Sequence, residues 1–146
     1  MGRVAIVTGA GRGIGASVAR MLAAEGWSLV LVDRCADDPD LPYPLATRAQ
    51  LDEVVADCGG AEGRAVAAVA DVRDQSALDT AVATAVERFG GLDAAVAAAG
   101  CIVGGDPTWC TSEAAWATMV GVNLEGVWRL SVAAVPALLA RPVPRQ

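Results

Sequence analysis

The feature that most constrains the fold is a glycine-rich turn at residues 8–15, which has the sequence TGAGRGIG. An apolar run rich in β-branched side chains comes directly before it, and a segment with helical periodicity follows. This order predicts a buried strand, a tight turn and a helix whose N-terminus lies above the strand end. Unpaired N–H groups and the positive end of the helix dipole make such an N-terminus an anion site, most often for a phosphate.

The glycines of this turn have separate roles in this interpretation. Gly9 allows the turn, Gly13 lets a pyrophosphate approach the backbone, and Gly15 lets the helix and the strand pack closely. A glycine pattern alone is weak evidence for a nucleotide site, so the strand before it and the helix after it carry the argument. The large apolar side chains predicted to form the buried face of the helix are Ile14, Val18, Met21 and Leu22.

A carboxylate ends the second predicted strand. Asp33 follows the apolar run 28–32, about 20 residues beyond the glycine turn, as in the dinucleotide-binding fingerprint. A carboxylate there accepts hydrogen bonds from both hydroxyls of an adenosine ribose and repels a 2′-phosphate, which favours NAD over NADP. Two alternatives stay open: Asp33 is an acidic cap in a solvated loop, or Arg12 or Arg34 neutralises a 2′-phosphate.

Composition indicates one folded α/β domain over residues 1–146. Hydrophobic residues make up 54% of the chain and aromatic residues only 4%, so Ala and Val build most of the core.

The net charge of −6 argues against nucleic acid as a partner, because no basic patch offsets phosphate charge. No apolar run reaches the roughly 18 residues of a membrane span, and the start of the sequence leaves no room for a signal peptide. We therefore expect a cytoplasmic protein with no membrane partner.

Metal binding is not expected. The chain has no His, and its four cysteines form no C-x-x-C pair, which argues against zinc and iron–sulfur sites. In a reducing compartment these thiols act as small apolar side chains. They are Cys35, Cys58, Cys101 and Cys110.

A Pro- and Asp-rich segment, 34–47, separates the second strand from the next predicted helix. A loop of this length is uncommon in a compact α/β unit and is usually either functional or disordered. Because it begins beside the predicted ribose site, we expect either that it folds over the adenosine half of a cofactor or that it is a solvated surface excursion.

The remaining elements alternate between helix and strand. We expect a helix at 48–58, a buried strand at 64–70, a helix after an Asp74 cap, and a fourth strand with its terminal turn at 93–100. A helix capped by Thr111 or Ser112 then runs to Val120, and a last helix follows that Pro136 is able to kink. This alternation predicts a Rossmann-type doubly wound parallel sheet of about four strands in the order 3-2-1-4. The nucleotide crevice falls between strands one and four.

These motifs resemble the short-chain dehydrogenase/reductase family over essentially the whole chain. The matching residues are Thr8, Gly9, Gly13, Gly15, Asp33, Asp71, Val72, Gly100 with the two alanines before it, and Asn123. The run from Asp33 to Thr47 is similar to the mycofactocin-associated branch. The members of that branch hold NAD tightly under such an insertion and pass electrons to a peptide-derived redox carrier.

The resemblance implies a role for each matching residue. Asp33 holds the adenosine ribose, Asp71 and Val72 flank the adenine, and Ala99 and Gly100 border the nicotinamide ribose. The residues implied to line the pyrophosphate are Gly9, Arg12, Gly13, Ile14 and Gly15.

The resemblance also implies that Asn123 holds a water in the proton-relay path. One position departs from the family: where an Asn usually helps to fix the central sheet, this chain has Ala98. A larger departure is that the family's proton-accepting Tyr, activated by a Lys four residues on and assisted by a Ser, has no counterpart. Free Tyr titrates near pH ~10 and needs such activation. The single tyrosine, Tyr43, lies between prolines, and all 11 basic residues are Arg.

Two functions follow from this pattern. The chain is either the N-terminal, NAD-binding portion of an oxidoreductase acting on a small alcohol or carbonyl substrate, with little activity alone, or it is a non-enzymatic dinucleotide-binding module or half of a split protein. A complementing C-terminal half would cover the apolar edge of strand four, which is otherwise prone to pairing. The last helix is a possible homo-oligomer interface.

Overall fold

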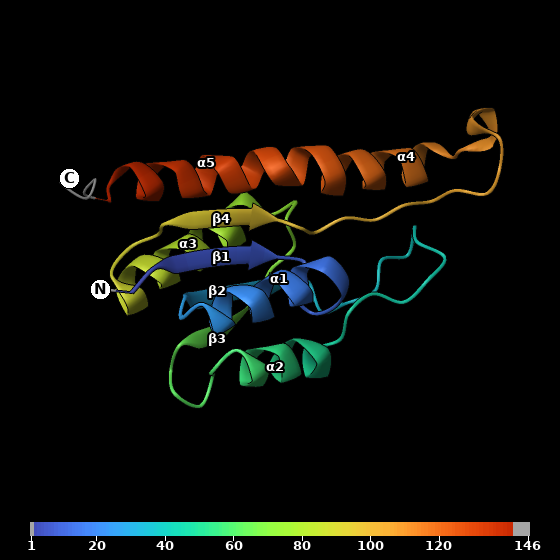
Figure 1. Cartoon of the computed structure of the whole chain (residues 1–146). Helices are drawn as coiled ribbons and strands as arrows, with labels where there is room; N and C mark the ends of the chain where they lie inside the picture. The colour runs from blue at the N-terminus through green and yellow to red at the C-terminus, as the bar shows by residue number, and fades with distance from the viewer. Residues whose placement is uncertain (1, 142–146) are drawn as a thin grey trace.

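A four-stranded parallel sheet forms the middle layer of the computed structural model, which describes residues 2–141 (Figure 1). The strand order is β3-β2-β1-β4, as predicted. Since the order reverses between β1 and β4, a crevice opens at the carboxyl ends of these strands. The strands are β1 (Val4–Thr8), β2 (Ser28–Asp33), β3 (Ala65–Val69) and β4 (Ala94–Ala97).

Helices cover both faces of the sheet, as a doubly wound fold requires (Figure 1). Alternate side chains of β1 and β2 point to opposite faces and contribute to two separate apolar cores. One core lies under α1 (Gly13–Ala24) and α2 (Arg48–Asp57), and the other lies under α3 (Gln75–Phe89) and α5 (Gly126–Leu139).

Helix α1 buries small side chains, so the predicted apolar face was wrong. Ile14 is 77% exposed and Met21 is 66% exposed, while Leu22 packs only partly against the core. A Cβ atom on Gly15 would lie 2.1 Å from the carbonyl oxygen of Gly9, so the helix passes too close to the turn for large side chains beneath it. The buried residues of α1 are Gly15, Ala16, Ala19 and Ala23.

The helix boundaries follow the predicted capping signals. Asp74 accepts a hydrogen bond from the backbone N–H of Ala77 and begins α3. Ser112, and not Thr111, caps α4 (Glu113–Val120) by accepting from the N–H of Ala115 at 3.2 Å.

Strand β3 is less buried than predicted. In β3 only Ala65 is fully buried and Val69 is 52% exposed, because β3 is an edge strand. At the other edge, β4 pairs with β1, and Ala95 and Ala97 are exposed within the described part of the chain.

A single helical stretch joins what the sequence predicts as two helices. A π-helical turn, η2 (Gly121–Glu125), connects α4 to α5, so the stretch runs continuously from Glu113 to Leu139, with Pro136 inside α5. By length and composition alone this stretch of 27 residues is able to cross a membrane. Within it Leu130 and Ala134 are buried against the sheet and α3, but only 17% of its most apolar 18-residue window is buried.

Candidate functional site

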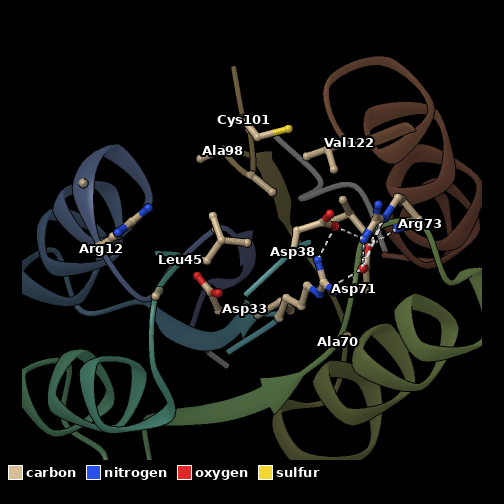
Figure 2. A pocket seen from close by; sticks show the side chains of 18 of the residues that line it. Arg12, Asp33, Asp38, Leu45, Ala70, Asp71, Arg73, Ala98, Cys101 and Val122 are labelled. Carbon is tan, nitrogen blue, oxygen red and sulfur yellow. Dashed lines mark hydrogen bonds and ion pairs between the residues drawn. The ribbon is translucent and has the colours of Figure 1, made fainter. Parts of the chain in front are cut away.

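A cavity of about 360 Å³ lies at the carboxyl ends of the strands (Figure 2). It brings together the glycine turn, the end of β2, segment 34–47, the β3–α3 connection and the end of β4. Most of the predicted site residues line it: Gly9, Arg12, Gly13, Ile14, Asp33, Asp71, Val72, Ala99 and Gly100. Gly15 and Asn123 do not, and the roles of all eleven residues toward a cofactor stay predictions.

The glycine turn lies directly against the end of β4. Gly9 has a φ of +66°, and a Cβ atom there would lie 2.7 Å from Cα of Ala99, so both the backbone conformation and the space require glycine. Gly13 has a φ of +58°, and a Cβ atom there would have no neighbouring atom within 4 Å, so the backbone is open to an approaching group.

The N-terminus of α1 is uncapped. Arg12 occupies the N-cap position with extended backbone and no capping hydrogen bond from its side chain, and the first turn of α1 carries no acidic residue. Arg12, Gly13 and Ile14 all line the cavity, so the positive end of this helix faces it. A phosphate or pyrophosphate fits here because it supplies the acceptors that the first-turn N–H groups need.

The Asp33 carboxylate is fixed at the cavity wall by two backbone donors. Its Oδ2 accepts a hydrogen bond from the N–H of Gly11 at 2.9 Å, and its Oδ1 accepts from the N–H of Cys35 at 3.2 Å. A Cβ atom on Gly11 would lie 2.8 Å from Cβ of Ala46 and 3.0 Å from Asp33 Oδ2. The sequence interpretation missed Gly11, although its place between the fingerprint glycines was a usable signal.

Segment 34–47 reaches across the cavity and is held on its far side. Leu41 and Leu45 from this segment line the cavity. The hydroxyl of Tyr43 accepts a hydrogen bond from the N–H of Ile102 at 2.9 Å, and Asp40 accepts one from the hydroxyl of Thr118 at 3.1 Å. Tyr43 therefore has a structural contact with the β4–α4 connection.

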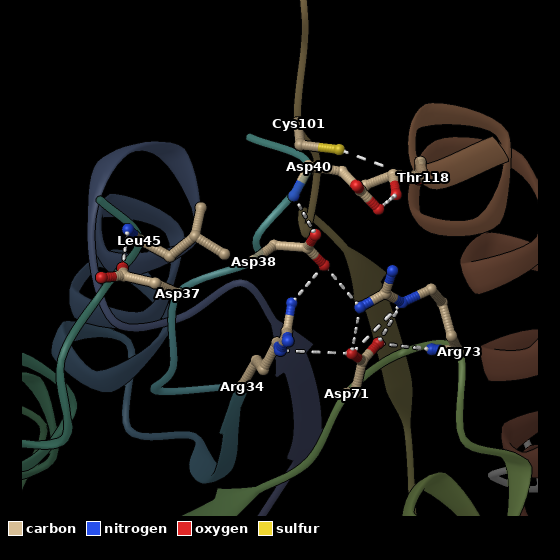
Figure 3. Close-up of polar contacts among 9 residues, drawn as sticks. All are labelled: Arg34, Asp37, Asp38, Asp40, Leu45, Asp71, Arg73, Cys101 and Thr118. Atoms are coloured by element: carbon tan, nitrogen blue, oxygen red, sulfur yellow. Dashed lines mark hydrogen bonds and ion pairs between the residues drawn. The ribbon is translucent and has the colours of Figure 1, made fainter. Parts of the chain in front are cut away.

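A cluster of four charged residues anchors the same segment to the β3–α3 connection (Figure 3). Asp38 Oδ2 lies 2.5 Å from Arg34 Nη1 and 2.8 Å from Arg73 Nη2. Asp71 Oδ2 lies 2.7 Å from Arg73 Nη2 and 3.3 Å from Arg34 Nε. We call Arg34, Asp38, Asp71 and Arg73 the charge cluster. Sequence reasoning did not single out Asp38 or Arg73, because Asp38 is one of three aspartates in an irregular loop.

The charge cluster keeps its carboxylates ionised. Burial alone would raise the pKa of Asp38, whose side chain is 4% exposed. Hydrogen bonds from the N–H of Asp40 and from Arg34 and Arg73 outweigh that effect and hold the pKa below its ordinary value. The pKa of Asp71 is also below its ordinary value. Burial would raise that pKa, but the hydrogen bonds and the charge of Arg73, together with the charge of Arg34, outweigh the effect of burial.

Asn123 lies outside the cavity and pins its edge. Its Oδ1 accepts from the N–H of Cys101 at 2.9 Å, and its Nδ2 donates to the carbonyl of Cys101 at 2.7 Å. Nearby, the hydroxyl of Thr8 accepts from the N–H of Ala99 at 3.4 Å. The end of β4 is thus hydrogen-bonded although Ala98 replaces the family's Asn. A water on Asn123 would use the second N–H of its side-chain amide, its backbone carbonyl or the remaining lone pair of Oδ1.

The described residues 2–141 contain no group of three or more His, Cys, Asp or Glu side chains able to hold a metal ion. The four cysteines are free thiols, and Cys101 borders the cavity. Burial raises the pKa of the Cys101 thiol above its ordinary value, so it is protonated near neutral pH.

Comparison with known proteins places the chain in a family. The family model described as short chain dehydrogenase matches residues 3–144. An uncharacterized NAD-dependent oxidoreductase of Mycobacterium tuberculosis is 46% identical over 140 residues, covering 94% of this chain and 50% of that protein. The (-)-trans-carveol dehydrogenase of Rhodococcus erythropolis is 40% identical over 139 residues, covering 95% of this chain and 50% of that protein.

A solved structure agrees with these sequence relatives. Carveol dehydrogenase from Mycobacterium avium in complex with NAD superposes with a TM-score of 0.89 at 39% identity, covering 95% of this chain and 50% of that one. The chain therefore spans about half the length of the relatives that it matches. The extent of the family match and the shared fold lead to one conclusion: the chain belongs to the short-chain dehydrogenase/reductase family.

Proposed function

We propose that this chain is the NAD-binding portion of an oxidoreductase that transfers a hydride between an alcohol or carbonyl substrate and the nicotinamide ring. The observation that carries the proposal is the Asp33 carboxylate, fixed by the N–H of Gly11 beside the uncapped N-terminus of α1. The acceptor proposed for the ribose and the helix end proposed for the phosphate thus lie in one cavity. Two of the similar proteins support the same cofactor: one is named an NAD-dependent oxidoreductase, and the other was solved in complex with NAD.

The residues of the cavity divide along the proposed cofactor. The N–H groups at the start of α1 and Arg12 would hold the pyrophosphate, with Gly9 and Gly15 shaping the turn, and Asp33 would bind the adenosine ribose. Asp71 and Val72 would flank the adenine, and Ala99 and Gly100 would border the nicotinamide ribose. When bound, NAD supplies the carbon that accepts or donates the hydride.

Residues 1–146 alone are proposed to transfer hydride poorly. They contain no Lys, and their one Tyr is held against the N–H of Ile102. Without a Tyr–Lys pair the substrate hydroxyl has no general base, a loss of roughly 10²- to 10⁴-fold. Asn123 would contribute only a water in the relay.

Segment 34–47 supports a finer assignment to the mycofactocin-coupled branch. Its sequence resembles that branch, and its position over the cavity suits a cofactor held beneath it. We also propose a cytoplasmic location, where a reducing environment keeps the four thiols free.

A second candidate is a dinucleotide-binding half that a partner chain completes. The observation that favours it is the exposed edge of β4, where Ala95 and Ala97 are uncovered in the described chain. A complementing half would add a parallel strand there and cover apolar side chains on the helical stretch, among them Trp116 and Trp128, which are 61% and 60% exposed. A second copy of this chain is the alternative occupant.

Calorimetric titration of the purified chain with NAD tests the proposal. We expect the chain to bind NAD, to bind NADP more weakly, and to form little NADH when an alcohol is added. The Asp33→Ala variant should lose the binding of NAD. Circular dichroism of both proteins shows whether they are folded. A folded chain that binds no NAD would contradict the proposed function. Recovery of NADH formation on mixing with the second half of a relative would favour the completed half-protein.

A further inference from the structure

We propose that Asp38 sets the cofactor preference of this site by holding Arg34 away from the position of a ribose 2′-phosphate. This inference rests on the proposed function, namely that the cavity binds a nicotinamide dinucleotide. Asp38 is thus a positioning residue that acts through Arg34, and NADP is the ligand that it excludes.

The sequence places two residues with opposite cofactor preferences next to each other at the end of β2. Asp33 suits the two free hydroxyls of an NAD ribose and repels a phosphate, whereas an arginine close by is the usual partner of a 2′-phosphate. Arg34 follows Asp33 directly, and both residues line the cavity. An unrestrained Arg34 would therefore weaken the discrimination that Asp33 provides.

The structure removes this conflict by directing Arg34 elsewhere. Figure 3 shows its guanidinium turned toward Asp38, on the same segment 34–47, and toward Asp71, on the β3–α3 connection. Nη1 contacts Asp38 and Nε contacts Asp71, so both ends of the guanidinium have an anionic partner. A 2′-phosphate would have to displace these carboxylates, which are already in place before any cofactor binds.

Asp38 is the stronger of the two restraints. Asp71 is engaged mainly by Arg73, whose backbone N–H and guanidinium contact it at 2.7–3.2 Å, and it reaches Arg34 at 3.3 Å. Asp38 Oδ2 lies 2.5 Å from Arg34 Nη1, and the Asp38 side chain is 4% exposed. Releasing Arg34 would leave a buried carboxylate with one partner fewer, which is costly in a poorly hydrated position.

The prediction is a change in the ratio of NADP to NAD affinity. We expect Asp38→Asn to tighten NADP relative to NAD by roughly tenfold, the worth of one charge-assisted hydrogen bond to a phosphate. The double variant Asp38→Asn with Arg34→Gln loses that gain. Asp37→Asn is the matched control, because it removes the same charge from the same segment. The partner of Asp37 is the N–H of Leu45, which donates to it at 2.8 Å, and not Arg34. Its ratio stays at the starting value.

The test is calorimetric titration of each folded variant with NAD and with NADP. If Asp38 had a purely structural role, Asp38→Asn would weaken the binding of NAD and of NADP together. The ratio of NADP to NAD affinity would then not depend on Arg34. An unchanged ratio in Asp38→Asn with NAD still bound overturns this inference alone, whereas a folded starting protein that binds neither cofactor overturns the proposed function and this inference with it.

A second variant decides the matter if Asp38→Asn does not fold. With Asp38 intact, Arg34→Gln leaves NADP binding unchanged if Arg34 is already withdrawn from the phosphate position. A further loss of NADP affinity in Arg34→Gln would show that Arg34 reaches the phosphate despite Asp38, and would overturn the inference. Arg12→Gln serves as a comparison: Arg12 is proposed to bind the pyrophosphate, which NAD and NADP share, so its loss should lower the affinity for both cofactors equally.

Discussion

The N–H of Gly11 donates a hydrogen bond to Oδ2 of Asp33 at 2.9 Å, and this contact joins the glycine turn to the end of β2. It fixes the carboxylate at the cavity wall before any ligand binds. The contact depends on the absence of a side chain at residue 11, because a Cβ atom there would lie 2.8 Å from Cβ of Ala46 and 3.0 Å from the Asp33 carboxylate. Pre-positioned groups bind ligands more tightly than groups that must be ordered on binding.

Gly11→Ala is therefore expected to weaken NAD binding by roughly tenfold, the usual worth of one hydrogen bond to a charged group. The new methyl group displaces either Asp33 or Ala46. Gly104→Ala is the control, because a Cβ atom there has no neighbour within 4 Å. Titration calorimetry with NAD compares the two, and equal affinities for both variants would show that the Gly11 contact does not matter.

The charge cluster makes a prediction about stability. Arg73→Gln removes one of the two arginines that contact both Asp38 and Asp71, so we expect the free energy of unfolding to fall by about 1–3 kcal/mol. Arg48→Gln breaks an ion pair with Asp52 whose side chains are 59% and 52% exposed, so it should lower the free energy of unfolding much less than Arg73→Gln does. Urea denaturation at pH 7 measures both. A cost for Arg48→Gln as large as that for Arg73→Gln would mean that burial of the cluster contributes nothing.

The lowered pKa values of Asp38 and Asp71 predict acid sensitivity. A carboxyl whose pKa is lower in the folded chain than in the unfolded chain stabilises the fold above the unfolded pKa, near ~3.9. That contribution is lost as the pH falls from about 4 through the lower folded values. We expect the free energy of unfolding to decline below pH ~4, and to decline less steeply in Asp38→Asn. Urea titrations between pH 2 and 6 would contradict this if both proteins showed the same slope.

The sequence pattern predicted the layout of the sheet because it depends on local signals. The runs ending at Thr8 and Asp33 are apolar and β-branched, and in the structure β1 is buried along its whole length between two helical layers. Capping is equally local, which is why Asp74 and Ser112 stand at helix starts as predicted. The strand order follows from chain connectivity and handedness.

The errors arose where distant parts of the chain decide the outcome. The packing face of α1 depends on how close the helix comes to the sheet, so Ala19 is buried and Ile14 is exposed, against the rule that the larger apolar side chain is the buried one. Asp38 looked like any other loop aspartate, because its partner Arg73 is 35 residues away in sequence. Gly11 escaped notice since its neighbour Ala46 comes from another segment.

The packing of α1 yields a prediction of its own. Ala19 is fully buried, so Ala19→Leu forces extra methylene groups between the helix and the sheet and should lower the free energy of unfolding by about 1–3 kcal/mol. Met21→Ser on the exposed face should change it by less than ~0.5 kcal/mol. Chemical denaturation of the two variants distinguishes this arrangement from the apolar face expected from sequence, which would make Met21→Ser the more harmful change.

The last prediction concerns Asn123, whose side-chain amide forms both hydrogen bonds with the backbone of Cys101. Asn123→Ala removes both contacts, so we expect the β4–α4 connection to loosen, with faster amide hydrogen exchange at Cys101 and Ile102 and a loss of about 1–2 kcal/mol in the free energy of unfolding. Asn123→Asp keeps the acceptor for the Cys101 N–H but places a carboxylate against the Cys101 carbonyl, so exchange should rise there too. Unchanged exchange at Cys101 in both variants would mean that other contacts hold the edge of the cavity, among them those of Tyr43 with Ile102, Thr8 with Ala99 and Met119 with Val103.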